Sequence, residues 1–277
     1  MQKSLRTKMF RKIATLASAF LIVHAIPARA GDAGADGNFE KRTSSHFVLF
    51  QDVDIDRTSG FRGSRRFEQQ VLEALERAYD QLDAMTGLRP ERPITVAIYD
   101  PAIFDARFAG LFRFPAAGFY GDSIHIRGDT VVSDRLVSVL HHELVHAALG
   151  ERAPSHAIPA WFNEGLAEWF EARALGKRGL SPWQFEALSR VASQGGLFSL
   201  GQLSRPSLGY MGPDSARLAY LQSYAFFDFL ARRHGERKIR EVISAYLRTG
   251  NLDRSFKRTY RDELDKLQLR FAKDYGG

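Results

Sequence analysis

Residues 141–171 read HHELVHAALGERAPSHAIPAWFNEGLAEWFE. His142, Glu143 and His146 form an H-E-x-x-H motif within this stretch. Residues four apart share one face of a helix, so the two imidazoles can point at a single ion. Glu143 follows at a position from which its carboxylate can reach a water molecule on that ion. The spacing is typical of a zinc hydrolase with two histidine ligands and a glutamate as general base.

The residues around the motif predict a helix. Ser133 or Asp134 is a suitable N-cap, and Gly150 is a suitable C-terminal stop. The apolar residues that recur at helical spacing are Val132, Leu136, Val139, Leu140, Leu144 and Ala147.

Three residues compete to be the third ligand. Glu164 lies on a second predicted helix, whose apolar residues can pack under the first and carry the carboxylate to the imidazoles. His156 does not fit the metzincin pattern, which needs glycine and histidine where this chain has Leu149 and Arg152. His141 points about 100° away from His142 around the helix. We therefore favour Glu164.

Two polar residues beside Glu164 are candidates for contacts behind the ligands. Asn163 precedes it, and Glu168 lies one turn beyond it. A carboxylate there can accept a hydrogen bond from a ligand histidine and fix its tautomer. The alternative is that Glu164 and Glu168 form a solvated acidic face.

A β-hairpin is predicted over residues 116–127, with its turn at Gly121-Asp122. Its first strand would offer Ala117, Gly118 and Tyr120 to an extended substrate backbone. A simple core hairpin explains the pattern equally well.

Residues 1–30 have the pattern of a secretory signal peptide. A basic start precedes an apolar run of 14 residues, 13–26, and Ala28-Arg29-Ala30 matches a cleavage site. The run is short for a membrane span of ~20 residues, although a single anchor is the alternative. We expect cleavage after Ala30, a periplasmic or secreted protein, and no stable membrane span afterwards.

The net charge of +7 comes mainly from this leader. Its six basic and no acidic residues, subtracted from 39 and 32, leave 33 basic and 32 acidic residues, a net charge of +1. The balance gives no argument for nucleic-acid binding. The chain has no cysteine, which excludes disulfides, cysteine zinc ligands and a cysteine nucleophile.

The order of predicted elements indicates an α+β fold. A small N-terminal mixed sheet with one packed helix should precede a zinc-site helix pair and a mainly helical C-terminal half. Residues 31–42 are expected to form a flexible N-terminus before a single domain over 43–277. Within that domain, 43–150 would be the α/β part and 151–277 the helical part.

The H-E-L-V-H motif followed by P-A-W-F-N-E-G-L-A-E-W-F-E resembles the gluzincin zinc metallopeptidases of the peptidase MA superfamily. Small exported bacterial members are the most similar. The resemblance spans residues 44–277, since the segments 44–47, 117–126 and 220–235 also look like theirs. The exopeptidase motif G-x-M-E-N is absent, and the loop between the two motifs is unusually rich in charge and proline. Aminopeptidase specificity is therefore not implied.

The resemblance also implies roles for individual residues. Zn²⁺ would be bound by His142, His146 and Glu164, with Glu143 as general base. A tyrosine of a later helix would stabilise the oxyanion; Tyr220 matches best, and Tyr224 and Tyr210 are weaker candidates.

These observations predict an exported zinc-dependent peptidase that acts on peptide or protein substrates. One alternative is a metal-dependent hydrolase of amides or cell-wall peptides. Another is a non-enzymatic binding module that keeps the fold. The oligomeric state is not indicated.

Overall fold

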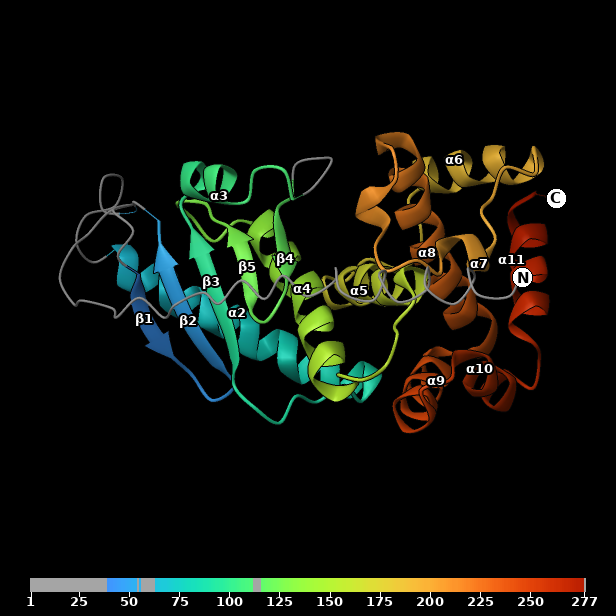
Figure 1. Cartoon of the computed structure of the whole chain (residues 1–277), viewed down its shortest axis with the longest axis horizontal. Coiled ribbons are helices and arrows are strands. Elements are labelled where there is room, and N and C mark those ends of the chain that lie inside the picture. The colour runs from blue at the N-terminus through green and yellow to red at the C-terminus, as the bar shows by residue number, and fades with distance from the viewer. Residues whose placement is uncertain (1–38, 54, 56–62, 112–115, 277) are drawn as a thin grey trace, which may run out of the picture.

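The structure, a computed structural model, describes residues 39–53, 55, 63–111 and 116–276. The predicted leader and the predicted loop at 112–115 lie outside these residues. Figure 1 shows a sheet with its helices at one end of the molecule, a purely helical part at the other, and helices α4 and α5 between them. This arrangement confirms the predicted α+β class.

The sheet has five strands in the order β1-β2-β3-β5-β4, so that β1 and β4 are its edges. β2, β3 and β5 are parallel neighbours, and each edge strand pairs antiparallel with its neighbour. The strands are β1 (Glu40–Thr43), β2 (Phe47–Asp52), β3 (Ile94–Tyr99), β4 (Gly118–Tyr120) and β5 (Ile124–Arg127).

Alternation along the strands gives the sheet two apolar faces. Phe47, Val96 and Ile126 point to one face and belong to the main core with helix α2 (Gly63–Thr86). Tyr99, on the other face, packs with residues of helix α3 (Pro101–Arg107) in a smaller aromatic cluster. The sheet is therefore covered on both faces.

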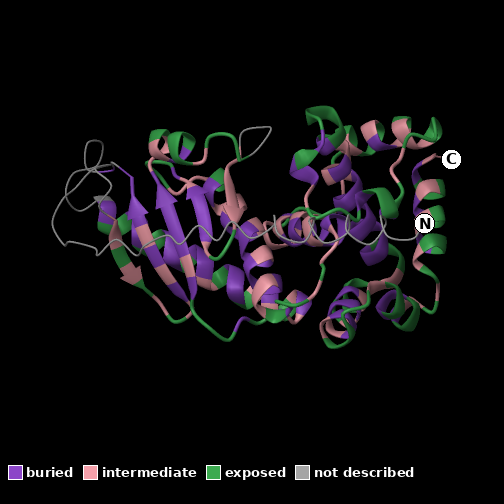
Figure 2. Ribbon diagram, in the orientation of Figure 1, coloured by how far each residue is buried: buried purple, intermediate pink, exposed green. Residues whose placement is uncertain are grey.

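The rest of the chain is helical. Figure 2 shows buried residues concentrated on the inner strands and on α5 and α8, with the outer helices exposed on one side. The elements are α4 (Asp134–Arg152), α5 (Ala160–Ala174), α6 (Pro182–Ser193), α7 (Leu200–Leu203), the 3₁₀ turn η1 (Leu208–Tyr210), α8 (Pro213–His234), α9 (Glu236–Thr249), α10 (Leu252–Tyr260) and α11 (Leu264–Gly276).

Helix α5 is packed between α4 and α8, which explains why its apolar residues surround it almost completely. Gly165 makes the contact with α8 possible. A Cβ atom there would lie 2.6 Å from the carbonyl oxygen of Ser223 and 2.8 Å from the ring of Phe227. Only glycine allows this approach of the two backbones.

The expectation of a flexible segment over 31–42 is wrong at its end. Glu40 and its neighbours form β1, which pairs with β2 from Glu40↔Gln51 to Thr43↔Val48. The strand is also held by polar contacts, since the Ser64 hydroxyl donates to Glu40 (2.7 Å) and Arg42 pairs with the buried Glu68. We predicted a flexible segment because these residues are polar, but polar and charged residues are also common on edge strands.

Across the described residues, every helix is too short or too polar to span a membrane.

Replacing Gly165 with alanine should destabilise the protein by about 1–3 kcal/mol, because the methyl group must push α5 and α8 apart. Gly201→Ala is the matched control, since the nearest atom to a Cβ on that helical glycine is 3.8 Å away. Chemical denaturation of both variants measures the difference. Equal stabilities would contradict the close contact.

The buried Glu68 should make stability fall as pH rises. Burial and the hydrogen bond with Glu40 raise the pKa of Glu68 from 4.5 to about 7, so the folded protein holds a proton that the unfolded chain has lost. The free energy of unfolding should therefore decrease between about pH 4.5 and 7. Glu68→Gln should flatten this dependence in denaturation curves, whereas Glu73→Gln, an exposed change on the same helix, should preserve it.

Candidate metal centre and active-site cleft

Helix α4 carries the two histidines of the H-E-x-x-H motif. Its first turn is capped by the Ser133 hydroxyl, which accepts a hydrogen bond from the amide of Leu136 (3.2 Å). The rings of His142 and His146 lie on one face, with centroids 4.9 Å apart. The buried Leu144 on the other side anchors the helix in the core.

Gly150 is not the end of this helix, contrary to expectation. The helix continues to Arg152, and the glycine serves the packing of Tyr120 from β4. A Cβ atom on Gly150 would lie 2.7 Å from the Tyr120 ring. The glycine that we interpreted as a helix stop is therefore needed for the close contact between α4 and the edge strand β4.

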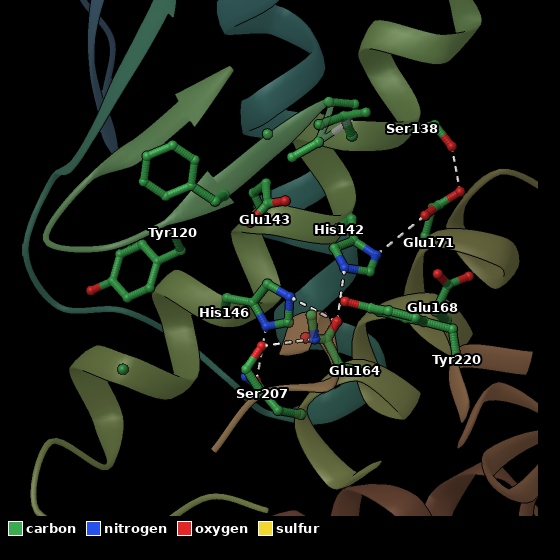
Figure 3. Close-up of a pocket in the computed structure, with 18 of the residues that line it drawn as sticks. Tyr120, Ser138, His142, Glu143, His146, Glu164, Glu168, Glu171, Ser207 and Tyr220 are labelled. Atoms are coloured by element: carbon green, nitrogen blue, oxygen red, sulfur yellow. Dashed lines mark hydrogen bonds and ion pairs between the residues drawn. The ribbon is translucent and has the colours of Figure 1, made fainter. Parts of the chain in front are cut away.

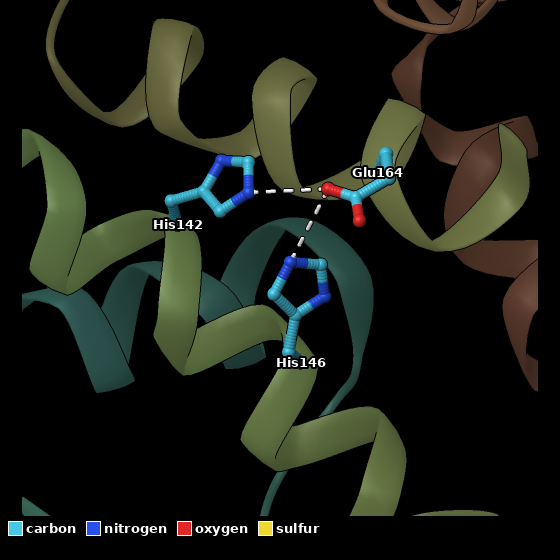
Figure 4. Close-up of side chains that lie close together, drawn as sticks. All are labelled: His142, His146 and Glu164. Atoms are coloured by element: carbon cyan, nitrogen blue, oxygen red, sulfur yellow. Dashed lines mark ion pairs between the residues drawn. The ribbon is translucent and has the colours of Figure 1, made fainter. Parts of the chain in front are cut away.

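Helix α5 brings Glu164 to the two histidines. One Glu164 oxygen, Oε2, lies 3.3 Å from Nε2 of His142 and 3.5 Å from Nε2 of His146. The three ligand atoms fall within 4.8 Å of one another. Figure 4 shows the three side chains pointing toward one another. Two imidazole nitrogens and one carboxylate oxygen are a donor set that suits zinc. The chemistry of these side chains therefore fits a bound divalent metal ion.

The charges of the three groups depend on one another. Burial alone would raise the pKa of Glu164, but His146 and the hydrogen bonds from both histidines hold it far below its usual range. Burial opposes protonation of His142, yet Glu164 and Glu171 raise the pKa of that imidazole well above its ordinary value. The site thus concentrates negative charge around the imidazoles, which favours a cation.

Further side chains orient the histidines from behind. Nδ1 of His146 lies 2.9 Å from the Asn163 side-chain oxygen, and Nδ1 of His142 lies 3.5 Å from Glu171. Ser138 donates a hydrogen bond to the same Glu171 carboxylate. Asn163, which we expected behind the ligands, therefore lies beside Nδ1 of His146.

The second of these contacts corrects an expectation from the sequence. We expected Glu168 behind a ligand histidine, whereas Glu171, two turns beyond Glu164, occupies that position. Glu168 lies between the two on the same side of α5 and lines the cleft (Figure 3). Glu171 follows Glu164 by two helical turns and so lies on the same face of the helix, and this spacing could have identified it from the sequence.

Glu143 differs from the other acidic residues of the site. It is buried, and its Oε2 atom makes no hydrogen bond to any of the residues that the structure describes. Burial raises the pKa of Glu143, while the neighbouring His146 and His142 oppose the rise. An unsatisfied carboxylate oxygen beside three metal-ligand atoms can accept a proton from a water molecule held there.

The two tyrosine candidates of helix α8 point in different directions. Tyr220 lines the cleft, and its hydroxyl points toward Glu164 and His142 in Figure 3. Burial and the Glu164 carboxylate raise the pKa of Tyr220 well above its usual range, so the hydroxyl keeps its proton. Tyr224 instead donates to the carbonyl oxygen of Gly179 (2.8 Å) and does not line the cleft. Tyr210 lies on η1 and is exposed.

The site opens into a cleft of about 790 Å³ between the sheet edge and the helical part. The expected substrate-binding residues Ala117, Gly118 and Tyr120 all line it. They belong to β4 or precede it, and in the described part of the chain β4 is an edge strand that pairs with β5. Sequence reasoning missed lining residues from the first turns of α4 and from segments farther along the chain, namely Asp134, Arg135, Ser138, Lys177, Pro206, Ser207 and Gly209.

The two competing histidines lie apart from the ligand cluster. His141 is buried, and its Nδ1 is 2.7 Å from the carbonyl oxygen of Val137. His156 packs on Tyr246 and contacts the carbonyl oxygen of Leu247. Among the described residues, the cluster of potential metal ligands consists of His142, His146 and Glu164.

Two comparisons with known proteins bear on which family this chain belongs to. The chain is similar to an uncharacterized protein, YhcO, of Bacillus subtilis (strain 168), with 24% identity over 260 residues, 87% of this chain and 76% of that protein. The family model of the peptidase MA superfamily matches residues 74–273, which include both site helices, the hairpin and α8. The chain therefore belongs to the peptidase MA superfamily.

Proposed function

We propose that this protein is an exported zinc-dependent peptidase of the gluzincin type. Membership of the peptidase MA superfamily supports a peptidase-type hydrolase. The observation that carries the finer proposal is the convergence of His142, His146 and Glu164 beside the unsatisfied carboxylate of Glu143. Export rests on the sequence of residues 1–30 alone, as does the division into leader and mature domain.

The metal ion would be held by the Nε2 atoms of His142 and His146 and a carboxylate oxygen of Glu164. When bound, Zn²⁺ supplies Lewis-acid polarisation of a carbonyl group and makes water more acidic. Asn163 and Glu171 keep the imidazoles oriented through their Nδ1 atoms. Each ligand histidine is thus fixed by a second contact, which limits the motion of the two imidazoles.

Glu143 is the proposed general base. Its free oxygen accepts the proton of the attacking water and later passes it to the leaving amine. Tyr220 remains protonated because its pKa is raised, and its hydroxyl donates a hydrogen bond to the carbonyl oxygen as charge develops there. The two groups approach the site from different helices, α4 and α8.

The cleft favours an extended peptide as the substrate. Among the described residues, β4 is an edge strand, and its outer side offers backbone hydrogen-bonding groups beside the ligand cluster. Gly118 keeps this strand close to α4, since a Cβ atom there would lie 2.9 Å from Val139 and 2.8 Å from Ile126. A pure binding module has no use for a buried, unsatisfied Glu143, so catalysis is the better explanation.

Glu143→Gln should retain the metal and the fold but lose about 10²–10⁴-fold in turnover, because the amide cannot accept the proton. Cleavage of an unbiased fluorogenic peptide library, with and without a chelator, measures the loss. Metal analysis of the purified variant checks the occupancy. Glu186→Gln, an exposed change on α6, is the control and should behave as the wild type. Undiminished hydrolysis by Glu143→Gln would refute the mechanism.

Glu171→Gln should weaken zinc binding by about 10–100-fold, because the carboxylate that faces Nδ1 of His142 is lost. Glu168→Gln changes a neighbouring carboxylate on the same helix and should have a smaller effect. Competition with a fluorescent zinc chelator measures both affinities. A larger loss from Glu168→Gln than from Glu171→Gln would contradict the contacts described above.

A further inference from the structure

A second, basic pocket lies between α9 and α10, which run next to each other in Figure 1. It has a volume of about 470 Å³ and shares no residue with the metal-site cleft. Four arginines line it, and Glu241 is its one acidic residue. The arginines are Arg237, Arg240, Arg248 and Arg258.

The pocket carries more net positive charge than residues 31–277 as a whole. Its lining carries a net charge of +3, from four arginines and one glutamate. Residues 31–277 as a whole carry a net charge of only +1. The positive charge is therefore a local feature of this groove and not a property of the whole surface.

The acidic residue of the pocket is already engaged. One oxygen of Glu241 lies 2.6 Å from Lys238, and the other lies 3.4 Å from Arg237. Its charge is thus shared between two cations on its own helix. Little of it remains to neutralise the other three arginines.

As far as the structure describes the chain, those three arginines lack carboxylate partners. Arg240 donates to the carbonyl oxygen of Ala84 (2.9 Å), and Arg248 donates to the Ser244 hydroxyl. Arg258 is exposed at the α10 side of the pocket. Among the described residues, no carboxylate lies within 4.0 Å of the guanidinium group of Arg240, Arg248 or Arg258.

Several arginines elsewhere in this protein are paired with carboxylates. Arg127 lies 2.8 Å from Asp105, Arg190 lies 2.8 Å from Glu186, and Arg217 lies 3.3 Å from Asp214. Three guanidinium groups that line one pocket without such partners repel one another. A bound anion would reduce this electrostatic repulsion. Within the part of the chain that the structure describes, three of the four arginines of the pocket therefore lack a negative counter-charge.

We propose that this pocket binds a phosphate-type oxyanion. The guanidinium group presents a planar fork of donors that matches phosphate oxygens, and all the cations that line the pocket are arginines. The Ser244 hydroxyl accepts from Arg248 and so keeps its own proton to donate. The volume accommodates a small phosphate ester.

A soluble phosphate ester and a phospholipid headgroup share this chemistry. Glycerol 3-phosphate is a suitable probe because it is also the headgroup portion of phosphatidic acid. The proposal is independent of the metal centre, so hydrolysis need not be measured to test it.

Calorimetric titration of the full chain with glycerol 3-phosphate, at an ionic strength fixed with sodium chloride, tests the proposal. Arg258→Gln should weaken binding about tenfold or more, since it removes charge-assisted hydrogen bonds. Arg190→Gln, a change in a paired arginine on α6, should leave the affinity unchanged. Arg248→Gln is the second pocket variant, and melting temperatures without ligand verify that each variant folds.

Vesicles of phosphatidylcholine, with and without phosphatidic acid, identify the source of the phosphate. Co-sedimentation with the phosphatidic acid vesicles that is lost in Arg258→Gln supports the pocket and assigns it to a lipid headgroup. Binding of glycerol 3-phosphate alone supports it and assigns a soluble ligand. The absence of both, or equal affinities for the wild type and the two pocket variants, would overturn the proposal.

Discussion

The burial of charge where α5 packs on α4 is the constraint on which this structure depends. Removing an isolated ion from water costs several kcal/mol, so His142, His146 and Glu164 are tolerated there because they face one another. Glu171 extends the pairing to the far side of His142. Glu143 is left out of this pairing, and that exclusion is what makes it available for proton transfer.

The helical half of the molecule holds this charged contact in place. α8 lies against α5 at Gly165, where the absence of a side chain lets the two backbones meet. The same contact brings Tyr220 across α5 to the cleft. Because α5 has apolar neighbours on both sides, its three glutamates project only into the space beside α4. The two parts of the α+β fold therefore contribute differently to the cleft: the sheet contributes an edge strand, and the helices contribute the charged side chains.

The sequence predicted the parts of the site that local periodicity determines. His142 and His146 lie on one helical face, and the predicted packing of two apolar helix surfaces brought Glu164 to them. The sequence did not predict which glutamate of α5 faces His142, because that depends on the angle between α4 and α5. Spacing alone cannot distinguish Glu168 from Glu171 as the partner of His142. Gly150 was misinterpreted for a similar reason. Glycine is favoured both at the end of a helix and where a helix contacts a strand closely, and the sequence alone does not distinguish the two. The lining segment at 206–209 approaches from across the cleft and carried no local signal.

The average charge of the chain conceals two opposite local environments. The cleft gathers four glutamates around two imidazoles, whereas the groove between α9 and α10 gathers four arginines around one glutamate. Interactions between exposed charges are screened over about 8–10 Å. The glutamates of the cleft and the arginines of the groove therefore each act mainly on nearby groups. A net charge of +1 therefore argues against an extended surface for a polyanion but not against a single anion site. The cleft favours a cation because four carboxylates lie close together there, and the groove favours an anion because three of its arginines have no carboxylate partner among the described residues.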